Sequence, residues 1–157
     1  MHGGSRDVAW VRPMRQGGAV TAGSRLETHH LWYTRVVTSA RPGSGAPILE
    51  VVFYRSQADN EPVREWLFSL SRADRRTIGQ DVKTAQSGWP LGMPLIRKLE
   101  SRLWEVRSRV TGVIARVVFT VDGSVMVLLH GFVKKSQTTP AADLKAARQR
   151  LARLDEE

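Results

Sequence analysis

Cysteine is absent from the 157 residues of this chain. Its absence excludes a disulfide framework and a thiolate metal site, and it fits a reducing compartment. Long apolar runs are absent as well: the longest, residues 125–129, has the length of a strand, whereas a membrane-spanning helix takes about 20 residues. The first residues, from Met1 on, lack the apolar core of a secretory signal. We therefore expect a soluble, cytoplasmic protein that does not enter a membrane.

Acidic residues are outnumbered by basic ones. The 15 Asp and Glu residues face 24 Lys and Arg residues, which gives a formal net charge of +9 and a pI near 11.0. Most of the basic residues are arginines, whose planar guanidinium groups bind two phosphate oxygens at once. This balance indicates a polyanionic partner such as a nucleic acid or the ribosome. A merely basic soluble surface is the alternative, and charge alone favours neither.

The first 47 residues differ in composition from the rest. They are rich in Gly, Ser, Thr and Arg, and they end in the linker-like stretch 39–47. Trp10, Trp32 and Tyr33 alternate with arginines, a pattern that suits stacking on RNA bases. More often such an arm is a flexible tail, or translation begins further along. We expect residues 1–47 to be a flexible basic extension and residues 48–157 to form one domain.

Local patterns in residues 48–157 predict four strands and three helices. β-branched and aromatic residues predict strands at 48–54, 103–108, 113–120 and 125–133, with a hairpin turn at Asp122-Gly123. A short helix should follow a cap at Asp59 or Asn60, and a second should run from the cap Ser71 to about residue 87. After a loop at 89–94, Thr139-Pro140 should cap and begin a third helix at 141–154.

The predicted order is therefore β-α-α-β-β-β-α. The last three strands should form an antiparallel meander, and the two early helices should pack on one face of the sheet. This arrangement is a compact α+β domain that follows an N-terminal extension.

Three blocks of the sequence resemble one known family. Residues 91–107 (LGMPLIRKLESRLWEVR), 116–119 (RVVF) and 128–140 (LLHGFVKKSQTTP) resemble the core signature, the next strand and the closing motif of phage-derived HigB-like toxins in the RelE superfamily. The LWEVR and HGFxKK blocks are specific in combination, whereas either alone is weak. The resemblance covers about residues 48–154, and residues 1–47 have no counterpart in it.

This resemblance implies a RelE-like fold and the toxin of a type II toxin–antitoxin module. Such a toxin inhibits translation by cleaving mRNA in the ribosomal A site, where the 2′-OH of the RNA attacks the adjacent phosphorus. It is a metal-independent endoribonuclease without a cofactor, and no cluster of His, Asp and Glu in this sequence has metal-ligand spacing. The implied partners are mRNA, the ribosome and a cognate antitoxin, often a helix-turn-helix protein, in a hetero-oligomer.

Cleavage by a 2′-OH needs a base, cations around the phosphorane and an acid for the leaving 5′-oxygen. Arg107 is our first candidate for the transition-state charge, followed by Arg116 and then by Lys134 and Lys135. One of the two lysines is also a candidate acid. His130, the only histidine outside the extension, is the candidate base. A hydrogen-bonded structural histidine is the equally weighted alternative.

Strand alternation predicts which of these side chains share a face. Glu105 and Arg107 should point the same way, and Arg116 should point with two apolar neighbours. A charge on such a strand must reach a phosphate or pair with Glu105, and we favour the phosphate. The side chain of His130 should share its face with Met126, Leu128 and Phe132.

Further residues are candidates for RNA binding rather than for chemistry. Arg97 and Lys98 should contact the RNA backbone, although a solvated charged turn is nearly as consistent with the pattern. Phe132 is a candidate for stacking on a base, whereas Trp104 fits core packing better.

Two other functional classes remain open at this level. A non-catalytic nucleic-acid-binding module uses the same basic residues without cleavage. A phage structural protein is the second alternative, because similar sequences occur in phage genomes. Cleavage that Arg107→Ala abolishes while RNA binding survives distinguishes the enzyme from the binding module.

Overall fold

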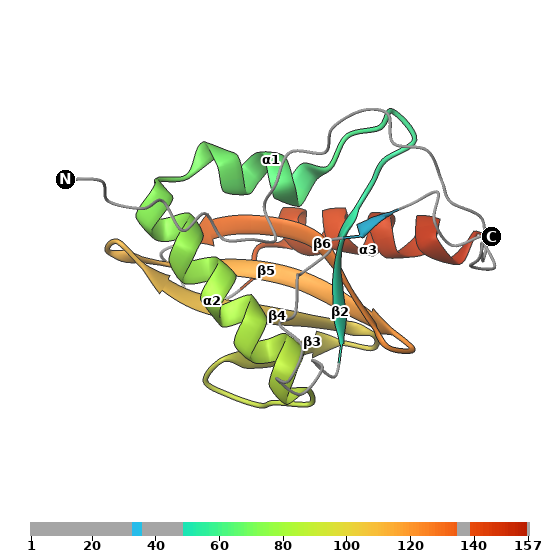
Figure 1. Ribbon diagram of the computed structural model, residues 1–157. Coiled ribbons are helices and arrows are strands. Elements are labelled where there is room, and N and C mark those ends of the chain that lie inside the picture. Colours follow the sequence, from blue (N-terminus) through green and yellow to red (C-terminus); the bar gives the residue numbers. More distant parts are fainter. Residues whose placement is uncertain (1–32, 36–48, 135–138, 157) are drawn as a thin grey trace, which may run out of the picture.

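A computed structural model describes residues 33–35, 49–134 and 139–156 of the chain. The elements within these residues are, in order, β1 (Tyr33–Arg35), β2 (Glu50–Tyr54), α1 (Pro62–Ser69), α2 (Arg72–Gly88), β3 (Ile96–Glu100), β4 (Leu103–Val110), β5 (Val113–Asp122), β6 (Val125–Lys134) and α3 (Ala141–Asp155). The strands form one sheet in the order β1-β2-β6-β5-β4-β3. Helices α1 and α2 cover one face and α3 covers the other (Figure 1). The fold is α+β, as the sequence predicted.

The helices of the first layer form where the sequence pattern places them. The Ser71 hydroxyl accepts a hydrogen bond from the backbone N–H of Asp74 at 3.2 Å, which caps α2 as predicted. Ile78, Val82 and Ala85 are buried on one side of this helix, because spacings of four and three residues return to the same face. The apolar stripe therefore fixes which side of α2 meets the sheet.

Two strands were not predicted. Strand β3 pairs with β4 as a hairpin, with Ile96 opposite Val106 and Arg97 opposite Glu105. Its sequence, IRKLE, follows two prolines and carries three charges, so the period-2 pattern is weak. Strand β1 pairs antiparallel with β2. The observed order, β-β-α-α-β-β-β-β-α, therefore adds two strands to the predicted one.

The sheet is also not antiparallel throughout. Strands β4, β5 and β6 form the predicted antiparallel meander, but β2 lies parallel to β6, with Glu50 opposite Val125 and Phe53 opposite Leu128. The chain between them crosses one face as α1 and α2 (Figure 1). This crossover makes β2 an inner strand beside β6.

The caps predicted for α1 and α3 are wrong in detail. Helix α1 has Pro62 in its first turn as expected, but Glu61 precedes it and makes no side-chain cap hydrogen bond. The Glu61 carboxylate instead accepts from the Arg64 guanidinium at 2.9 Å. Helix α3 follows Pro140, again without a side-chain cap. The Thr139 hydroxyl is engaged elsewhere, in the buried network described below.

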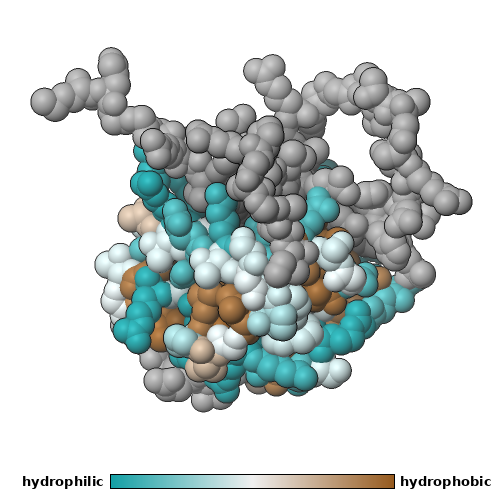
Figure 2. All heavy atoms as spheres, turned by 60° about the horizontal axis from the view of Figure 1, so that its bottom comes forward, coloured by the Kyte–Doolittle hydropathy of each residue, from teal (hydrophilic) through white to brown (hydrophobic). Residues whose placement is uncertain are grey.

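Apolar residues of the sheet pack in two clusters, one against each helical layer. Phe53, Phe119 and Met126 face α1 and α2, whereas Leu129 packs with Ala147 of α3 on the other side. Apolar areas on the surface shown in Figure 2 are separated by polar ones. Most of the large apolar side chains in the described residues are therefore buried in the two clusters.

Gly131 of β6 allows α1 to approach the sheet closely. A Cβ atom built at this position would lie 2.2 Å from the nearest ring carbon of Trp66, well inside a van der Waals contact. The indole of α1 therefore covers a strand position that only glycine fits.

Candidate functional site

A row of three side chains crosses the sheet on the face that α3 partly covers. Arg107 of β4 is opposite Arg116 of β5, and Arg116 is opposite Phe132 of β6. Directly paired residues point to the same side of a sheet. The alternation that predicted these faces is therefore confirmed for β4 and β5.

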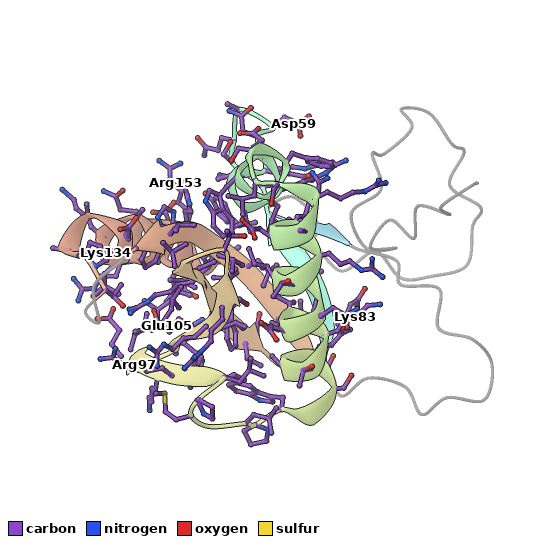
Figure 3. All side chains as sticks on the ribbon, turned by 90° about the vertical axis from the view of Figure 1, so that its left-hand side faces the viewer. Asp59, Lys83, Arg97, Glu105, Lys134 and Arg153 are labelled. Atoms are coloured by element: carbon purple, nitrogen blue, oxygen red, sulfur yellow. The ribbon has the colours of Figure 1, made fainter. Side chains whose placement is uncertain are left out.

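Two parallel rows add further cations to the same face. Arg97 of β3 is opposite Glu105, while Arg109 and Lys134 are both opposite Ile114. Arg97, Glu105 and Lys134 lie on the side of the sheet away from α2 (Figure 3). We call the four residues at the surface of this region the basic face: Arg97, Arg107, Arg109 and Lys134.

Arg116 is not part of that surface. Its side chain and that of Glu105 are both fully buried, and Nη1 of Arg116 lies 3.4 Å from Oε1 of Glu105. Phosphate binding by Arg116, which the sequence favoured, requires an accessible guanidinium. The structure contains the alternative, an ion pair, because a charge on the buried part of a strand needs an opposite charge.

The hydroxyl of Thr139 completes this buried network. It donates a hydrogen bond to Oε2 of Glu105 at 3.1 Å and accepts one from Nη1 of Arg116 at 3.3 Å. Thr139 therefore connects the segment before α3 to the middle of the sheet. No local sequence pattern predicts this contact, because it joins residues far apart in the chain.

Burial and neighbouring charges act in opposite directions on Arg116. Burial lowers the pKa of its guanidinium, Glu105 raises it, and the cations Arg107 and Arg97 lower it further. The two surface arginines are thus close enough to repel the buried one. The basic face concentrates positive charge that Glu105 only partly neutralises.

Arg107 is half-buried at the edge of the loop before β3. Its Nη1 approaches the sulfur of Met93 at 4.0 Å, and its backbone N–H donates to the carbonyl of Leu95 at 2.8 Å. No carboxylate forms an ion pair with Arg107 within residues 49–134 and 139–156. A guanidinium held by its strand and left without an anion is suited to a phosphate ligand.

His130 occupies a different face from the one predicted. The pairing between β5 and β6 shifts between Val118 and Phe119, so that β6 carries an extra residue. This bulge turns His130 toward α3, together with Phe132, whereas Met126 and Leu128 face α1 and α2. The prediction was right for Phe132 and wrong for the two residues before the bulge.

Both ring nitrogens of His130 have partners on α3. Arg150 can only donate, so its contact of 2.9 Å to Nδ1 makes that atom the acceptor. The proton then lies on Nε2, which donates to the Asp143 carboxylate at 2.6 Å. The ring also stacks on Phe132, with centroids 5.7 Å apart. This arrangement matches the structural alternative for His130, because no lone pair of the ring is available to a substrate.

The remaining candidates are distributed over several places. Lys98 is opposite Trp104, so it points to the face opposite Arg97. Phe132 is 8% exposed and packs in the α3 cluster, which favours a packing role over base stacking. Lys135 lies outside the described residues. Arg109 was not among the predicted site residues, although alternation from Arg107 places its side chain on the same face.

Trp104 packs as predicted, with its ring centroid 5.1 Å from that of Trp89 and 6.0 Å from that of Phe119. Among the described residues, no group of three or more His, Asp or Glu side chains is arranged to hold a metal ion. No helix in the same part of the chain combines the length and apolarity needed to cross a membrane.

Comparison with known protein families identifies one match. The family described as "Phage derived protein Gp49-like (DUF891)" matches residues 65–152, more than half of the chain. The match runs from α1 to α3 and includes the whole basic face. A comparison with curated proteins finds no match. Since a family match of this extent includes the helices, the meander and the basic face together, the chain belongs to the family of phage-derived Gp49-like proteins.

Proposed function

We propose that this protein is the toxin of a type II toxin–antitoxin module and that it cleaves mRNA, in the ribosomal A site, through its basic face. Membership of the phage-derived Gp49-like family supports a toxin, and the HigB-like motifs support this specificity. The observation that carries the proposal is Arg107, a half-buried guanidinium without an ion-paired carboxylate in the described residues. Arg97, Arg109 and Lys134 surround it with further positive charge.

The chemistry follows from the positions of these groups. The 2′-oxygen of the RNA bonds to the adjacent phosphorus, the bond from phosphorus to the 5′-oxygen breaks, and a 2′,3′-cyclic phosphate results. Arg107 stabilises the charge on the phosphorane oxygens, and Lys134 donates the proton that the leaving 5′-oxygen needs. The buried Arg116 pairs with Glu105 of β4 and so stabilises the strand that positions Arg107.

His130 is the proposed base, and its accessibility depends on Arg150. Asp143 fixes the proton on Nε2 and leaves Nδ1 as the basic atom. The Arg150 guanidinium must release Nδ1 before this atom takes the 2′-OH proton. Substrate binding that competes for Arg150 provides such a release.

Induced expression in bacteria tests the function. Wild-type protein should arrest growth and produce new mRNA ends with 2′,3′-cyclic phosphates inside translated regions. Arg107→Ala should abolish both effects, because one such donor is worth about 100-fold or more in rate. Arg76→Ala is the matched control, since this exposed arginine of α2 lies on the other side of the sheet. Normal growth and intact RNA with soluble wild-type protein would contradict the proposal.

A second candidate function is non-catalytic binding of nucleic acid. The engagement of both His130 nitrogens favours it, because the basic face then has cations but no accessible base. RNA binding that depends on Arg107 without any RNA cleavage would support this second function. The proposed toxin would also bind a cognate antitoxin as its partner, which co-expression and co-purification test directly.

A further inference from the structure

A pocket of about 620 Å³ lies away from the basic face, between α3, the loop after β2 and the start of α1. Tyr54, Gln57 and Asn60 line it from the loop side, and Gln149, Arg150 and Arg153 line it from α3. Arg153 lies at the end of the molecule that carries Asp59, whereas Arg97 lies toward the opposite end (Figure 3). The pocket is open toward solvent, and its lining combines polar side chains with the Tyr54 ring.

Arg150 is a half-buried cation in the wall of this pocket. Its Nη1 donates to the carbonyl of Leu129 at 2.7 Å and to Nδ1 of His130 at 2.9 Å, and both acceptors are neutral. The guanidinium lies over the Tyr54 ring, 5.9 Å from its centroid. Burial lowers the pKa of Arg150. A partly desolvated cation with neutral partners gains from an anion that enters the pocket.

Other arginines around α3 already have carboxylate partners. Arg148 pairs with Glu100 at 2.6 Å and Arg102 pairs with Asp155 at 2.8 Å. Within the described residues, neither Arg150 nor Arg153 has an ion pair of this kind. The two are three residues apart on α3, so their side chains are neighbours on one side of the helix. Glu65 is the one carboxylate of the lining, which leaves the pocket with an excess of positive charge.

We propose that this pocket binds a phosphorylated nucleotide of the RNA that lies beside the nucleotide whose bond is cut. The phosphate pairs with Arg150 and Arg153, and the amides of Gln57, Asn60 and Gln149 bind the base edge or the ribose. Amide side chains offer both donors and acceptors, as base edges do, which favours a nucleotide over an acidic peptide. That the nucleotide belongs to an RNA rests on the proposed function, whereas the binding of a nucleotide to the pocket does not.

Arg150 couples the pocket to His130. A phosphate that draws the guanidinium into the pocket weakens its hydrogen bond to Nδ1, and this atom then becomes a free base. Arg150 lines the pocket and lies 2.9 Å from Nδ1 of His130, so the pocket adjoins the basic atom of the ring. RNA fragments that leave the pocket without a phosphate should therefore be cut slowly.

Equilibrium binding of adenosine 5′-monophosphate to the full chain tests the pocket. Arg153→Gln should weaken binding by about tenfold or more, because the variant loses a hydrogen bond between the guanidinium and the charged phosphate. Gln149→Ala should weaken binding of the nucleotide but not of inorganic phosphate. Lys145→Gln removes an exposed charge from the same helix outside the pocket, and its affinity should equal that of the wild type.

The outcomes separate this proposal from the proposed function. If all three variants bind the nucleotide as the wild type does, the proposal of a nucleotide site in this pocket is wrong, even if Arg107→Ala still abolishes RNA cleavage. Unchanged nucleotide affinity with loss of antitoxin binding in Arg153→Gln also overturns it and assigns the pocket to a protein partner. Selective loss of nucleotide affinity in Arg153→Gln supports it, even where the wild type cleaves no RNA and the proposed function fails.

Discussion

Arg107 lies directly opposite Arg116 across the β4–β5 ladder, so two like charges occupy one pair position of the sheet. Such a pair is destabilising by itself. It is tolerated here because Glu105 pairs with Arg116 beneath the surface. The buried carboxylate of Glu105 therefore allows Arg107 to lie at the surface opposite the buried Arg116, and the basic face depends on a group that is itself fully buried.

Removal of the Glu105 charge should destabilise the fold strongly. Glu105→Gln leaves Arg116 buried without its anion, and we expect a loss of about 3–5 kcal/mol in the free energy of unfolding, measured by urea denaturation. Replacing both residues with apolar ones, Glu105→Leu with Arg116→Met, should recover most of the loss. A single variant that loses less than about 1 kcal/mol would show that the ion pair does not support the sheet.

Glu100 should contribute to stability at neutral pH but not in acid. Its hydrogen bond from Arg148 lowers the pKa of the carboxyl, against an opposing effect of burial. A folded-state pKa below the unfolded one stabilises above the unfolded value, about 4.3, and the contribution is lost as the pH falls through the folded value. Glu100→Gln should therefore be less stable than the wild type at pH 7, and the difference should vanish at pH 2. A difference that persists at pH 2 would contradict this.

Gly131→Ala should disturb the packing of α1. The added Cβ meets the Trp66 ring, and overpacking of this kind costs about 1–3 kcal/mol. Thermal denaturation measures the loss. Gly92→Ala is the control, because nothing lies within 4 Å of a Cβ there. Adding Trp66→Leu to Gly131→Ala should restore part of the stability, and failure of this rescue would locate the strain elsewhere.

Arg109→Gln should reduce the salt dependence of RNA binding. Each cation that neutralises a phosphate of single-stranded RNA contributes about 0.7 to the slope of log K against log salt. We expect the slope of the variant to fall by about this amount for an oligonucleotide with 2′-O-methyl groups, which is not cut. Arg76→Gln, on α2, should leave the slope unchanged. Equal slopes for the two variants would remove Arg109 from the basic face.

Much of the fold follows from local sequence signals. The stripe of Ile78, Val82 and Ala85 and the cap at Ser71 define α2, and the turn at Asp122-Gly123 joins β5 to β6, with Gly123 at a φ of +56°. Strand β3 and the parallel pairing of β2 escaped prediction. The first has a weak alternation, and the second depends on the whole crossover rather than on any local pattern.

The candidate site was only partly predictable for the same reason. Alternation along β4 and β5 placed Arg107 and Arg116 on one face, because a regular strand keeps its period of two. Strand β6 carries one extra residue between Leu128 and His130. Because of this bulge, Met126 and Leu128 point to the opposite face of the sheet from His130. The partners on α3, Asp143 and Arg150, depend on how this helix packs against β6. Composition and spacing do not contain that information.

The parallel pairing of β2 with β6 also sets an order of events during synthesis. Strand β2 is made before α1, yet its inner neighbour β6 is made only after α1, α2 and strands β3 to β5. Contacts so distant along the chain form slowly, because a long loop must close first. Thr139, which completes the network under the basic face, is translated later still. The nascent chain therefore gains its assembled arginine surface only after Thr139 has been added.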